Sequence, residues 1–276
     1  MISSTVFTKI TIITPSFNQG KFLEETILSV LNQKYSNLEY IIFDGGSSDN
    51  SVEIIKKYKK QLAYWESQKD RGQSHAINKG LRIATGDIIG WLNSDDTYLP
   101  GTFNIIVRMF QRYPEFDAIY GNQVLTDTEG RFLRIKHELP YSYHRLMYNM
   151  YQSQPATFLR RSVIDQIGFL NEDLHYSMDY EYFLRLGKRC KVKHVPYLFA
   201  KYRLHANSKS ATYGQDKHMT EINTVVSNFR PNYSNIKLLD DLIHGLFELL
   251  YSGTRILLVL LDNPLGFFKY LHFKKY

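Results

Sequence analysis

Cysteine is almost absent from this 276-residue sequence, which contains only Cys190. One cysteine cannot form an intramolecular disulfide, and it cannot supply the several thiolates of a structural zinc site. A chain of this length buries enough apolar surface to fold without either device. We therefore expect one or two domains held by an ordinary hydrophobic core, in a protein suited to a reducing compartment.

Long apolar runs are also missing. No uncharged apolar stretch reaches the roughly 18 residues that a membrane-spanning helix needs. Residues 1–7 have neither the basic nor the apolar region of a secretory signal peptide. These absences predict a cytoplasmic protein.

Several familiar catalytic and nucleotide-binding motifs do not occur. The first predicted helix is not opened by G-x-G-x-x-G, which disfavours a dinucleotide-dependent oxidoreductase. The sequence has no P-loop, no G-x-S-x-G nucleophile elbow and no H-E-x-x-H zinc motif. The net charge of +7 comes from 34 basic and 27 acidic residues that form no basic stripe, so we expect no nucleic-acid partner.

What the first half does contain is an alternation of strand-like and helix-like segments. Strands are predicted at residues 9–14, 38–43, 61–66, 87–92 and 117–126, and helices at 20–33, 52–58, 74–84 and 100–113. A capping box of Asn50 and Glu53 is expected to open the second helix. Repeated strand–helix–strand units with short connections predict an α/β fold with a mostly parallel sheet covered by helices on both faces. Ligands of such sheets bind beyond the carboxyl ends of the strands.

The second half is less regular. Strands are predicted at residues 131–136, 157–159, 191–196 and 199–204, and helices at 141–151, 163–167, 179–188, 215–228 and 238–261. Residues 231–235 are the best boundary before a C-terminal helical appendage. The sequence shows no internal repeat and no long linker.

Two adjacent carboxylates, Asp95 and Asp96, follow the apolar strand at residues 87–92. Adjacent carboxylates repel each other unless a cation neutralises them. Mg²⁺ and Mn²⁺ prefer oxygen ligands, often carboxylates together with the phosphates of a ligand. The pair therefore indicates a divalent cation held against a diphosphate, although an aspartate turn or helix cap explains it equally well.

Other polar residues stand at the ends of predicted elements. Asp44 precedes two glycines after the second strand, where it could accept hydrogen bonds from a base or a ribose. Arg71 lies near the start of the third helix and could help to bind an anion there. Asp179 stands at the start of a later helix. It is either a general base or a carboxylate that only complements the helix dipole. His205 ends the last strand and is either a metal ligand or a structural histidine.

Together, the order and context of these motifs are specific. The chain resembles family-2 glycosyltransferases of the GT-A fold, closely over residues 9–125 and more loosely beyond them. The residues that carry the resemblance are Thr14, Pro15, Ser16, Phe17, Asn18, Asp44, Gly45, Gly46, Ser47, Ser48, Asp49, Asp70, Arg71, Gly72, Ala76, Asn78, Gly80, Gly86, Asp87, Asn93, Ser94, Asp95, Asp96, Gln154, Thr157, Asp179, Tyr180, Glu181 and His205.

The resemblance implies an inverting transfer of a sugar from a nucleotide-diphosphate sugar, with UDP as the expected nucleotide. It implies Mn²⁺ or Mg²⁺ as the cofactor, bound by Asp96 and His205, and Asp179 as the catalytic base. The usual acidic neighbour before this base is Met178 here, so Glu181 is the fallback. The implied contacts are, for the donor, Thr14, Pro15, Ser16, Asn18, Asp44, Asp70, Gly72, Gln73, Asn78, Ser94 and Asp95, and, for the acceptor, Gln154 and Glu181.

The resemblance also implies a division of the chain. We expect a catalytic domain over residues 1–230, with a nucleotide-binding half to about residue 125 and an acceptor-binding half after it. The segment at 231–276 includes a leucine-rich stretch with charges and an aromatic, lysine-rich end. This composition suits a helix at the inner face of the cell membrane, or a contact with the catalytic domain or with a second subunit in a homodimer. By family analogy the acceptor is a saccharide or lipid-linked saccharide for a bacterial surface polysaccharide.

Three other classes stay open. A metal-dependent nucleotidyltransferase would also use paired acids, but it needs a glycine-rich basic loop after the first strand, where this chain has TPSFNQG. A non-catalytic nucleotide-sugar-binding module would bind the donor without turnover. A hydrolase with paired carboxylates would need no nucleotide.

Overall fold

The computed structural model describes residues 8–148, 150–206, 208–212 and 216–230, together with Leu246 and Leu249. Its strands are β1 (Ile10–Ser16), β2 (Leu38–Asp44), β3 (Tyr64–Ser67), β4 (Ile88–Trp91), β5 (Thr97–Tyr98), β6 (Ala118–Thr126), β7 (Phe132–Lys136), β8 (Thr157–Arg160) and β9 (Val192–Arg203). Its helices are α1 (Gly20–Leu31), α2 (Ser51–Tyr58), α3 (Gln73–Ile83), α4 (Thr102–Arg112), α5 (Tyr143–Leu146), α6 (Ser162–Ile167), α7 (Met178–Arg189) and α8 (Asp216–Ser227), with 3-10 turns η1 (Lys59–Gln61) and η2 (Lys209–Thr212). The helix predicted at 238–261 and the segment at 231–276 lie outside the described residues, apart from Leu246 and Leu249.

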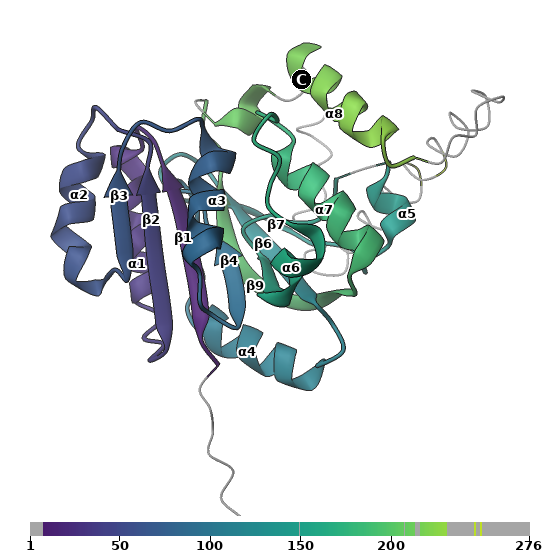
Figure 1. The fold of residues 1–276 in the computed structure, drawn as a ribbon, viewed down its shortest axis with the longest axis horizontal. Helices are drawn as coiled ribbons and strands as arrows, with labels where there is room; N and C mark the ends of the chain where they lie inside the picture. Colours follow the sequence, from purple (N-terminus) through teal and green to yellow (C-terminus); the bar gives the residue numbers. More distant parts are fainter. Residues whose placement is uncertain are drawn as a thin grey trace, which may run out of the picture.

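The described strands form one sheet in the order β3-β2-β1-β4-β8-β6-β9-β5, with β7 paired to β6. Strands β3, β2, β1 and β4 run parallel and lie side by side (Figure 1). Strand β8 then pairs antiparallel with both β4 and β6, whereas β9 runs parallel to β6. The predicted α/β architecture is therefore confirmed, and its later strands add antiparallel pairs to the parallel first half.

Alternate side chains of the central strands pack into two hydrophobic cores, one on each face of the sheet. Ile10 and Ile12 of β1 pack with residues of α1, α2 and α4. Ile13 packs with residues of α3 and α7 on the other face. Successive side chains of a strand point to opposite faces, so a strand covered on both sides must be apolar throughout. Figure 1 shows α3 lying across this second face.

Three local predictions differ from the structure. The side chain of Asn50 makes no capping hydrogen bond, and Asp49 Oδ1 instead accepts the Ser51 N–H at 3.0 Å. The two strands predicted around residue 197 are one strand, β9, whose pairing with β6 shifts register near Gly121. A Cβ on Gly121 would lie 2.5 Å from the Tyr197 carbonyl oxygen, so the absence of a side chain permits this irregular pairing.

The helix predicted at residues 141–151 is only the single turn α5. The Tyr151 hydroxyl bonds back to the backbone N–H and carbonyl of Ser142 at 2.6 and 3.0 Å. In a continuous helix these residues would stand about 13 Å apart along the axis. The chain therefore folds back after α5 and buries Tyr151 in the core.

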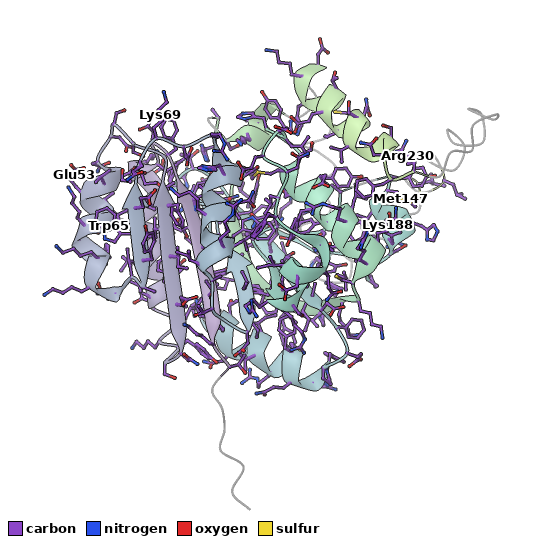
Figure 2. All side chains as sticks on the ribbon, in the orientation of Figure 1. Glu53, Trp65, Lys69, Met147, Lys188 and Arg230 are labelled. Atoms are coloured by element: carbon purple, nitrogen blue, oxygen red, sulfur yellow. The ribbon has the colours of Figure 1, made fainter. Side chains whose placement is uncertain are left out.

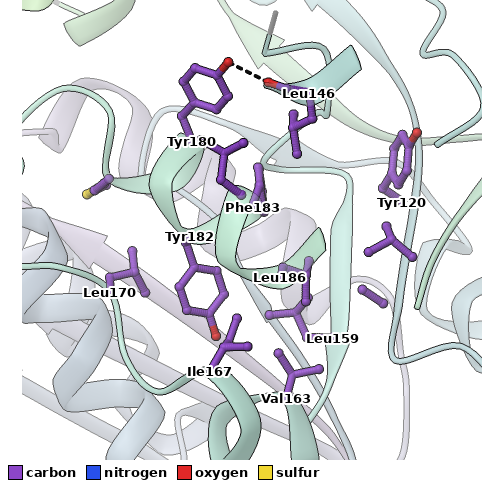
Figure 3. Packing of buried hydrophobic residues seen from close by; sticks show 14 of the residues in the cluster. Tyr120, Leu146, Leu159, Val163, Ile167, Leu170, Tyr180, Tyr182, Phe183 and Leu186 are labelled. Atoms are coloured by element: carbon purple, nitrogen blue, oxygen red, sulfur yellow. Dashed lines mark hydrogen bonds between the residues drawn. The ribbon is translucent and has the colours of Figure 1, made fainter. Parts of the chain in front are cut away.

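Helix α7 packs its apolar side chains into the core that α3 also covers. Figure 3 shows Tyr182, Phe183 and Leu186 within this packing. The Tyr180 hydroxyl donates to the Leu146 carbonyl at 2.6 Å and joins α7 to α5. The position of α7 is thus fixed by burial along most of its length.

Helix α8 extends the same core. Val225 and Val226 are buried in it. Beyond the helix, Arg230 lies near Met147, and its Nε donates to the Met147 carbonyl at 3.1 Å (Figure 2). Within the described part of the chain, none of the helices combines the length and apolar character required to cross a bilayer.

Candidate functional site

The loops after β1, β2 and β4 meet at the carboxyl edge of the parallel strands, as the sequence predicts. Asn18, in the loop after β1, has a positive φ of 51° and accepts the Ser48 N–H at 2.8 Å through Oδ1. Gln73, at the start of α3, donates from Nε2 to Asn93 Oδ1 at 2.7 Å. These bonds join segments that the sequence separates widely.

Asp44 organises the turn after β2. Its Oδ2 accepts the N–H groups of Gly46 and Ser47 at 3.1 and 2.9 Å and the Ser67 hydroxyl at 2.7 Å. Its Oδ1 accepts the Ser47 hydroxyl at 2.5 Å. Gly46 has a φ of 82°, a conformation that glycine adopts without strain. The carboxylate is therefore buried and held by four donors at this edge of the sheet.

Asp70 lies against this turn. A Cβ on Gly45 would come within 3.1 Å of Asp70 Oδ2, so a larger residue would press on the carboxylate. Asp70 Oδ1 also accepts the Gly72 N–H at 2.8 Å, directly before α3. Asp44, Asp70 and Gly72 thus lie together, as the donor-site expectation requires.

The last residues of β1, directly before the loop, are buried. Thr14 Oγ1 is 3.1 Å from the Tyr40 hydroxyl, inside the core. Pro15 and Ser16 complete the strand and are buried too. The Ser16 hydroxyl is a buried polar group with no hydrogen-bond partner among the described residues. This hydroxyl lies in register with Asp44 of the neighbouring strand.

The acidic pair lies beyond β4. Ser94 and Asp96 are buried, and their carbonyls accept the Thr26 hydroxyl at 2.9 and 2.8 Å. Asp96 Oδ1 accepts the Arg203 backbone N–H at 3.0 Å, whereas Oδ2 has no hydrogen-bond partner in the described chain. Burial raises the pKa of Asp96 well above its usual range, and the neighbouring Asp95 charge raises this pKa further. An unpaired buried carboxylate oxygen is costly, and an approaching cation would relieve that cost.

Sequence analysis missed Arg203, whose buried guanidinium supports the acidic turn. Its Nε donates to the Asp95 carbonyl at 3.0 Å, and its Nη1 donates to the Thr128 carbonyl at 2.9 Å. It also pairs with Glu25 and lies 4.9 Å from the Phe22 ring centroid. Its place two residues before His205 was visible in the sequence, but no local pattern separates it from surface arginines.

His205 joins this group from the end of β9. Its Nε2 lies 3.0 Å from Asp95 Oδ2, and its ring packs 4.8 Å from the Phe22 ring. Asp95, Asp96 and His205 offer two carboxylates and one imidazole, a donor set that suits Mn²⁺ or Mg²⁺ completed by phosphate and water oxygens. Within the described ranges, however, no group of three or more His, Cys, Asp or Glu side chains is arranged so that it could hold a metal ion by itself. The unpartnered Asp96 Oδ2 fits an ion whose remaining ligands are oxygens of the bound substrate and water.

Asp179 stands in the first turn of α7, and its Oδ1 accepts the Tyr180 N–H at 2.8 Å. Burial raises the pKa of Asp179 to about 6, against hydrogen bonds from the backbone N–H groups of Tyr180 and Asp179 itself and the weaker opposing charges of Lys209 and Lys136. A carboxylate that titrates near neutrality can accept a proton efficiently at physiological pH.

In two of the predicted contact residues, the side-chain amide forms hydrogen bonds within the protein through both its nitrogen and its oxygen. Asn78 donates to the Leu170 carbonyl and to Glu172 Oε1, both at 2.9 Å, and accepts the Leu170 N–H at 2.9 Å. Gln154 donates to the Trp91 carbonyl at 2.8 Å, and its Oε1 accepts from the Asn93 amide at 3.1 Å. These bonds argue against direct ligand contact and give both amides a role in holding the loops.

Glu181 has a different partner from the one expected. Its two oxygens accept from Nε and Nη2 of Arg185, at 2.6 and 2.8 Å, one helical turn along α7. Residues two apart in a helix point to nearly opposite sides, so Glu181 faces away from Asp179. This arrangement argues against Glu181 as acceptor contact or fallback base.

Comparisons with known proteins agree with this geometry. The family model described as Glycosyl transferase family 2 matches residues 11–170. Chondroitin synthase of Escherichia coli is 28% identical over 204 residues, which cover 73% of this chain and 30% of that protein. The chain spans 38% of another bacterial relative, an uncharacterized glycosyltransferase. It therefore spans about a third of the length of these two curated relatives.

Solved structures share the fold. S. aureus TarS in complex with UDP-GlcNAc has a TM-score of 0.65 at 17% identity, covering 80% of this chain and 66% of that one. Mannosyltransferase PcManGT from Pyrobaculum calidifontis, in complex with GDP-Man and Mn²⁺, has a TM-score of 0.63 at 15% identity, covering 98% and 80%. The expected GT-A fold is confirmed by these likenesses.

Proposed function

Because the chain belongs to glycosyl transferase family 2 and is a glycosyltransferase, we propose that it moves a sugar from a nucleotide-diphosphate sugar to a saccharide or lipid-linked acceptor, with inversion at the anomeric carbon. The proposed pathway is the synthesis of a cell-surface polysaccharide. The observation that carries the proposal is the acidic pair at the carboxyl edge of β4, in which Asp96 is buried and its Oδ2 lacks a hydrogen-bond partner among the described residues.

The proposed donor site lies between the acidic pair and the turn after β2. Asp70 faces the nucleoside there, and Asp44 shapes the same end of the site by holding the turn after β2. Ser16, Asn18, Gly72, Gln73 and Asp95 complete the pocket together with the backbone of Thr14, Pro15 and Ser94. A structural neighbour binds UDP-GlcNAc and another binds GDP-Man. We propose a UDP-sugar, with a GDP-sugar as the alternative that the experiment below distinguishes.

The proposed cofactor is Mn²⁺ or Mg²⁺, held by Asp96 and His205 beside Asp95. When bound, such an ion stabilises the negative charge of the leaving diphosphate as a Lewis acid. The Mn²⁺ of the mannosyltransferase neighbour supports this role. Arg203 helps to hold the acidic turn in place through its bond to the Asp95 carbonyl.

Asp179 is the proposed catalytic base. Its carboxylate takes the proton from the acceptor hydroxyl, the resulting oxygen bonds to the anomeric carbon, and the bond from that carbon to the diphosphate breaks. A single displacement of this kind inverts the configuration. Its pKa of about 6 leaves Asp179 mostly ionised at neutral pH and basic enough to accept a proton.

We propose the division of labour expected from the sequence, with donor binding in residues 1–125, acceptor binding in 126–230 and a peripheral membrane contact by 231–276. The base, on α7, belongs to the second of these units. The transfer would then take place where the two halves of the sheet meet.

The test is a thermal shift of the full chain against UDP-, dTDP- and GDP-sugars, with and without Mn²⁺. A ligand at 100 times its Kd adds about 2.7 kcal/mol, which is roughly 5–10 °C for this size. We expect a shift with one nucleotide only, and only with the ion. A folded sample that no donor stabilises would contradict the donor site.

A further inference from the structure

The segment that leads into α7 is held by an acidic side chain from another helix. Glu221 of α8 accepts the backbone N–H groups of Tyr176 and Ser177 through Oε1, both at 2.7 Å, and the N–H of His175 through Oε2 at 3.0 Å. The Ser177 hydroxyl also donates to Oε1 at 2.8 Å. One carboxylate thus receives four hydrogen bonds from residues 175–177.

These bonds lie at the N-terminus of α7, where the side chain of the N-cap residue normally accepts a hydrogen bond from a backbone N–H of the first turn. Ser177 is the residue before α7, yet its side chain makes no capping bond within that helix and donates to Glu221 instead. Burial by itself would raise the pKa of Glu221, but hydrogen bonds from His175, Ser177 and Tyr176 bring this pKa below its ordinary value. A negative charge beside a helix N-terminus is also favourable to the helix dipole.

The same segment is held from its carbonyl side. Lys209 Nζ, in η2, donates to the His175 carbonyl at 2.8 Å. Two residues after Ser177 comes Asp179, the proposed base, whose pKa the positive charges of Lys209 and Lys136 lower. The backbone before Asp179 is therefore fixed by side chains from the chain after β9.

We propose that Glu221 is a positioning residue for the transfer reaction: it holds residues 175–177 so that the first turn of α7 presents Asp179 to the acceptor hydroxyl. This inference rests on the proposed function, in which Asp179 is the base. Glu221 and α8 lie outside residues 11–170, the part matched by the family model. A displacement of about 1 Å at a reacting group can cost on the order of 10²-fold in rate, so loss of this anchor should act mainly on kcat.

Helix α8 has other contacts that keep it in place when Glu221 is changed. Val225 and Val226 are buried in the core shared with α7. His218 stacks on Tyr176 with ring centroids 4.8 Å apart. Substitution of Glu221 should therefore release the backbone of 175–177 without detaching the helix.

The experiment compares the full chain with Glu221→Ala and Glu221→Gln. Glutamine keeps the size and one acceptor oxygen but turns an N–H₂ group toward a backbone donor, so it should show a smaller effect. Asp216→Asn is the matched control because Asp216 is an exposed acid on the same helix. Circular dichroism confirms that each variant is folded.

The first measurement is hydrogen–deuterium exchange of the peptide that covers residues 174–182, which needs no substrate. Bonds to a charged acceptor stabilise enough that their loss should speed local exchange at least about tenfold in Glu221→Ala. Glu221→Gln should exchange at an intermediate rate and Asp216→Asn like the parent. Unchanged exchange in folded Glu221→Ala would overturn the proposal.

The second measurement is the release of nucleoside diphosphate from UDP-GlcNAc or GDP-mannose with Mn²⁺, with water as the acceptor. We expect kcat to fall on the order of 10²-fold in Glu221→Ala and about tenfold in Glu221→Gln, while donor KM stays within twofold. A kcat within twofold of the parent would overturn the positioning role even if exchange had risen. Release that survives Asp179→Asn would instead count against the base assignment of the proposed function, and the exchange comparison would still decide whether Glu221 holds the segment.

Discussion

Two carboxylates near this site carry raised pKa values for different local reasons. The pKa of Asp96 is raised by burial and by the neighbouring Asp95 charge, and one of its oxygens has no hydrogen-bond partner in the described chain. Asp179 is desolvated at the start of a helix, where hydrogen bonds from backbone N–H groups, and to a smaller extent the charges of Lys209 and Lys136, limit the rise of its pKa to about 6. The first environment suits a group that a cation completes, and the second suits a group that exchanges a proton.

The proposed base can be tested by Asp179→Asn. The amide keeps the shape of the side chain but cannot take a proton, so transfer should fall on the order of 10²–10⁴-fold. Donor affinity, measured by titration calorimetry with the donor and Mn²⁺, should stay within twofold of the parent. Activity close to that of the parent would remove Asp179 from the mechanism.

The pH dependence follows from the same group. A base works only when deprotonated, so kcat/KM should rise about tenfold per pH unit below about 6 and level off above it. The measurement is kcat/KM between pH 4.5 and about 8, with folding followed at each pH by circular dichroism. A profile that is flat across the region of this pKa would contradict the role of Asp179.

The proposed metal ligand can be tested by Asp96→Asn. This change removes a buried charge and keeps an acceptor for the Arg203 N–H, so the metal-free protein should be at least as stable as the parent. The thermal shift that UDP causes with Mn²⁺ should shrink to the value measured without the ion. An undiminished Mn²⁺-dependent shift would exclude Asp96 as a ligand.

At the scale of elements, α3 shows how one helix can serve both packing and the site. Its first residues stand at the donor loops, whereas Gly80 lies so close to β1 that a Cβ would meet Ile13 at 2.5 Å. Asn78, between these two parts, spans to the backbone of Leu170 before α7. Ala76-x-Asn78-x-Gly80 is part of the family resemblance. In this structure, Asn78 and Gly80 of the pattern serve the packing of α3.

This reading of Asn78 predicts the outcome of Asn78→Ala. The change leaves the Leu170 N–H and carbonyl buried without their partners, which should lower the free energy of unfolding by about 2–3 kcal/mol. Donor affinity should not change by more than twofold. Urea unfolding and calorimetry measure the two effects, with the exposed Asn223→Ala as the matched control. A selective loss of donor affinity without loss of stability would restore Asn78 as a donor contact.

At the scale of the whole molecule, the sequence continues beyond the proposed catalytic domain to residue 276. Residues 267–275 contain three lysines and no acidic residue, interleaved with aromatic side chains. Such a segment gains free energy from an anionic lipid surface through both charge and apolar contact. If the acceptor is lipid-linked, this contact would bring the site to it.

We expect the full chain to sediment with vesicles that contain anionic lipid and a chain ending at Arg230 to stay in the supernatant. The bound fraction should fall at high salt because the electrostatic part of the attraction is screened. Gel filtration of both forms distinguishes the alternative contact with a second subunit. Equal sedimentation of the two forms would contradict the membrane role of the segment.

The sequence by itself determined the α/β fold and the family, and it predicted the edge of the sheet at which the candidate site lies. It could do so because each motif, such as Asp44 or the Asp95–Asp96 pair, directly follows a short apolar strand, and parallel strands end at one edge. Local spacing carries that information without knowledge of distant partners.

Only the tertiary structure decided which side chains face the site and which hold it together. Arg203 meets Asp96 across 107 positions, Asn78 meets Leu170 across 92, and Glu221 meets Ser177 across 44. No local pattern marks these partners, because hydrogen bonding between distant segments depends on how the helices pack on the sheet. The pairing of Glu181 with Arg185 is different, because it is a local contact between residues four apart in α7, on the side of the helix away from Asp179.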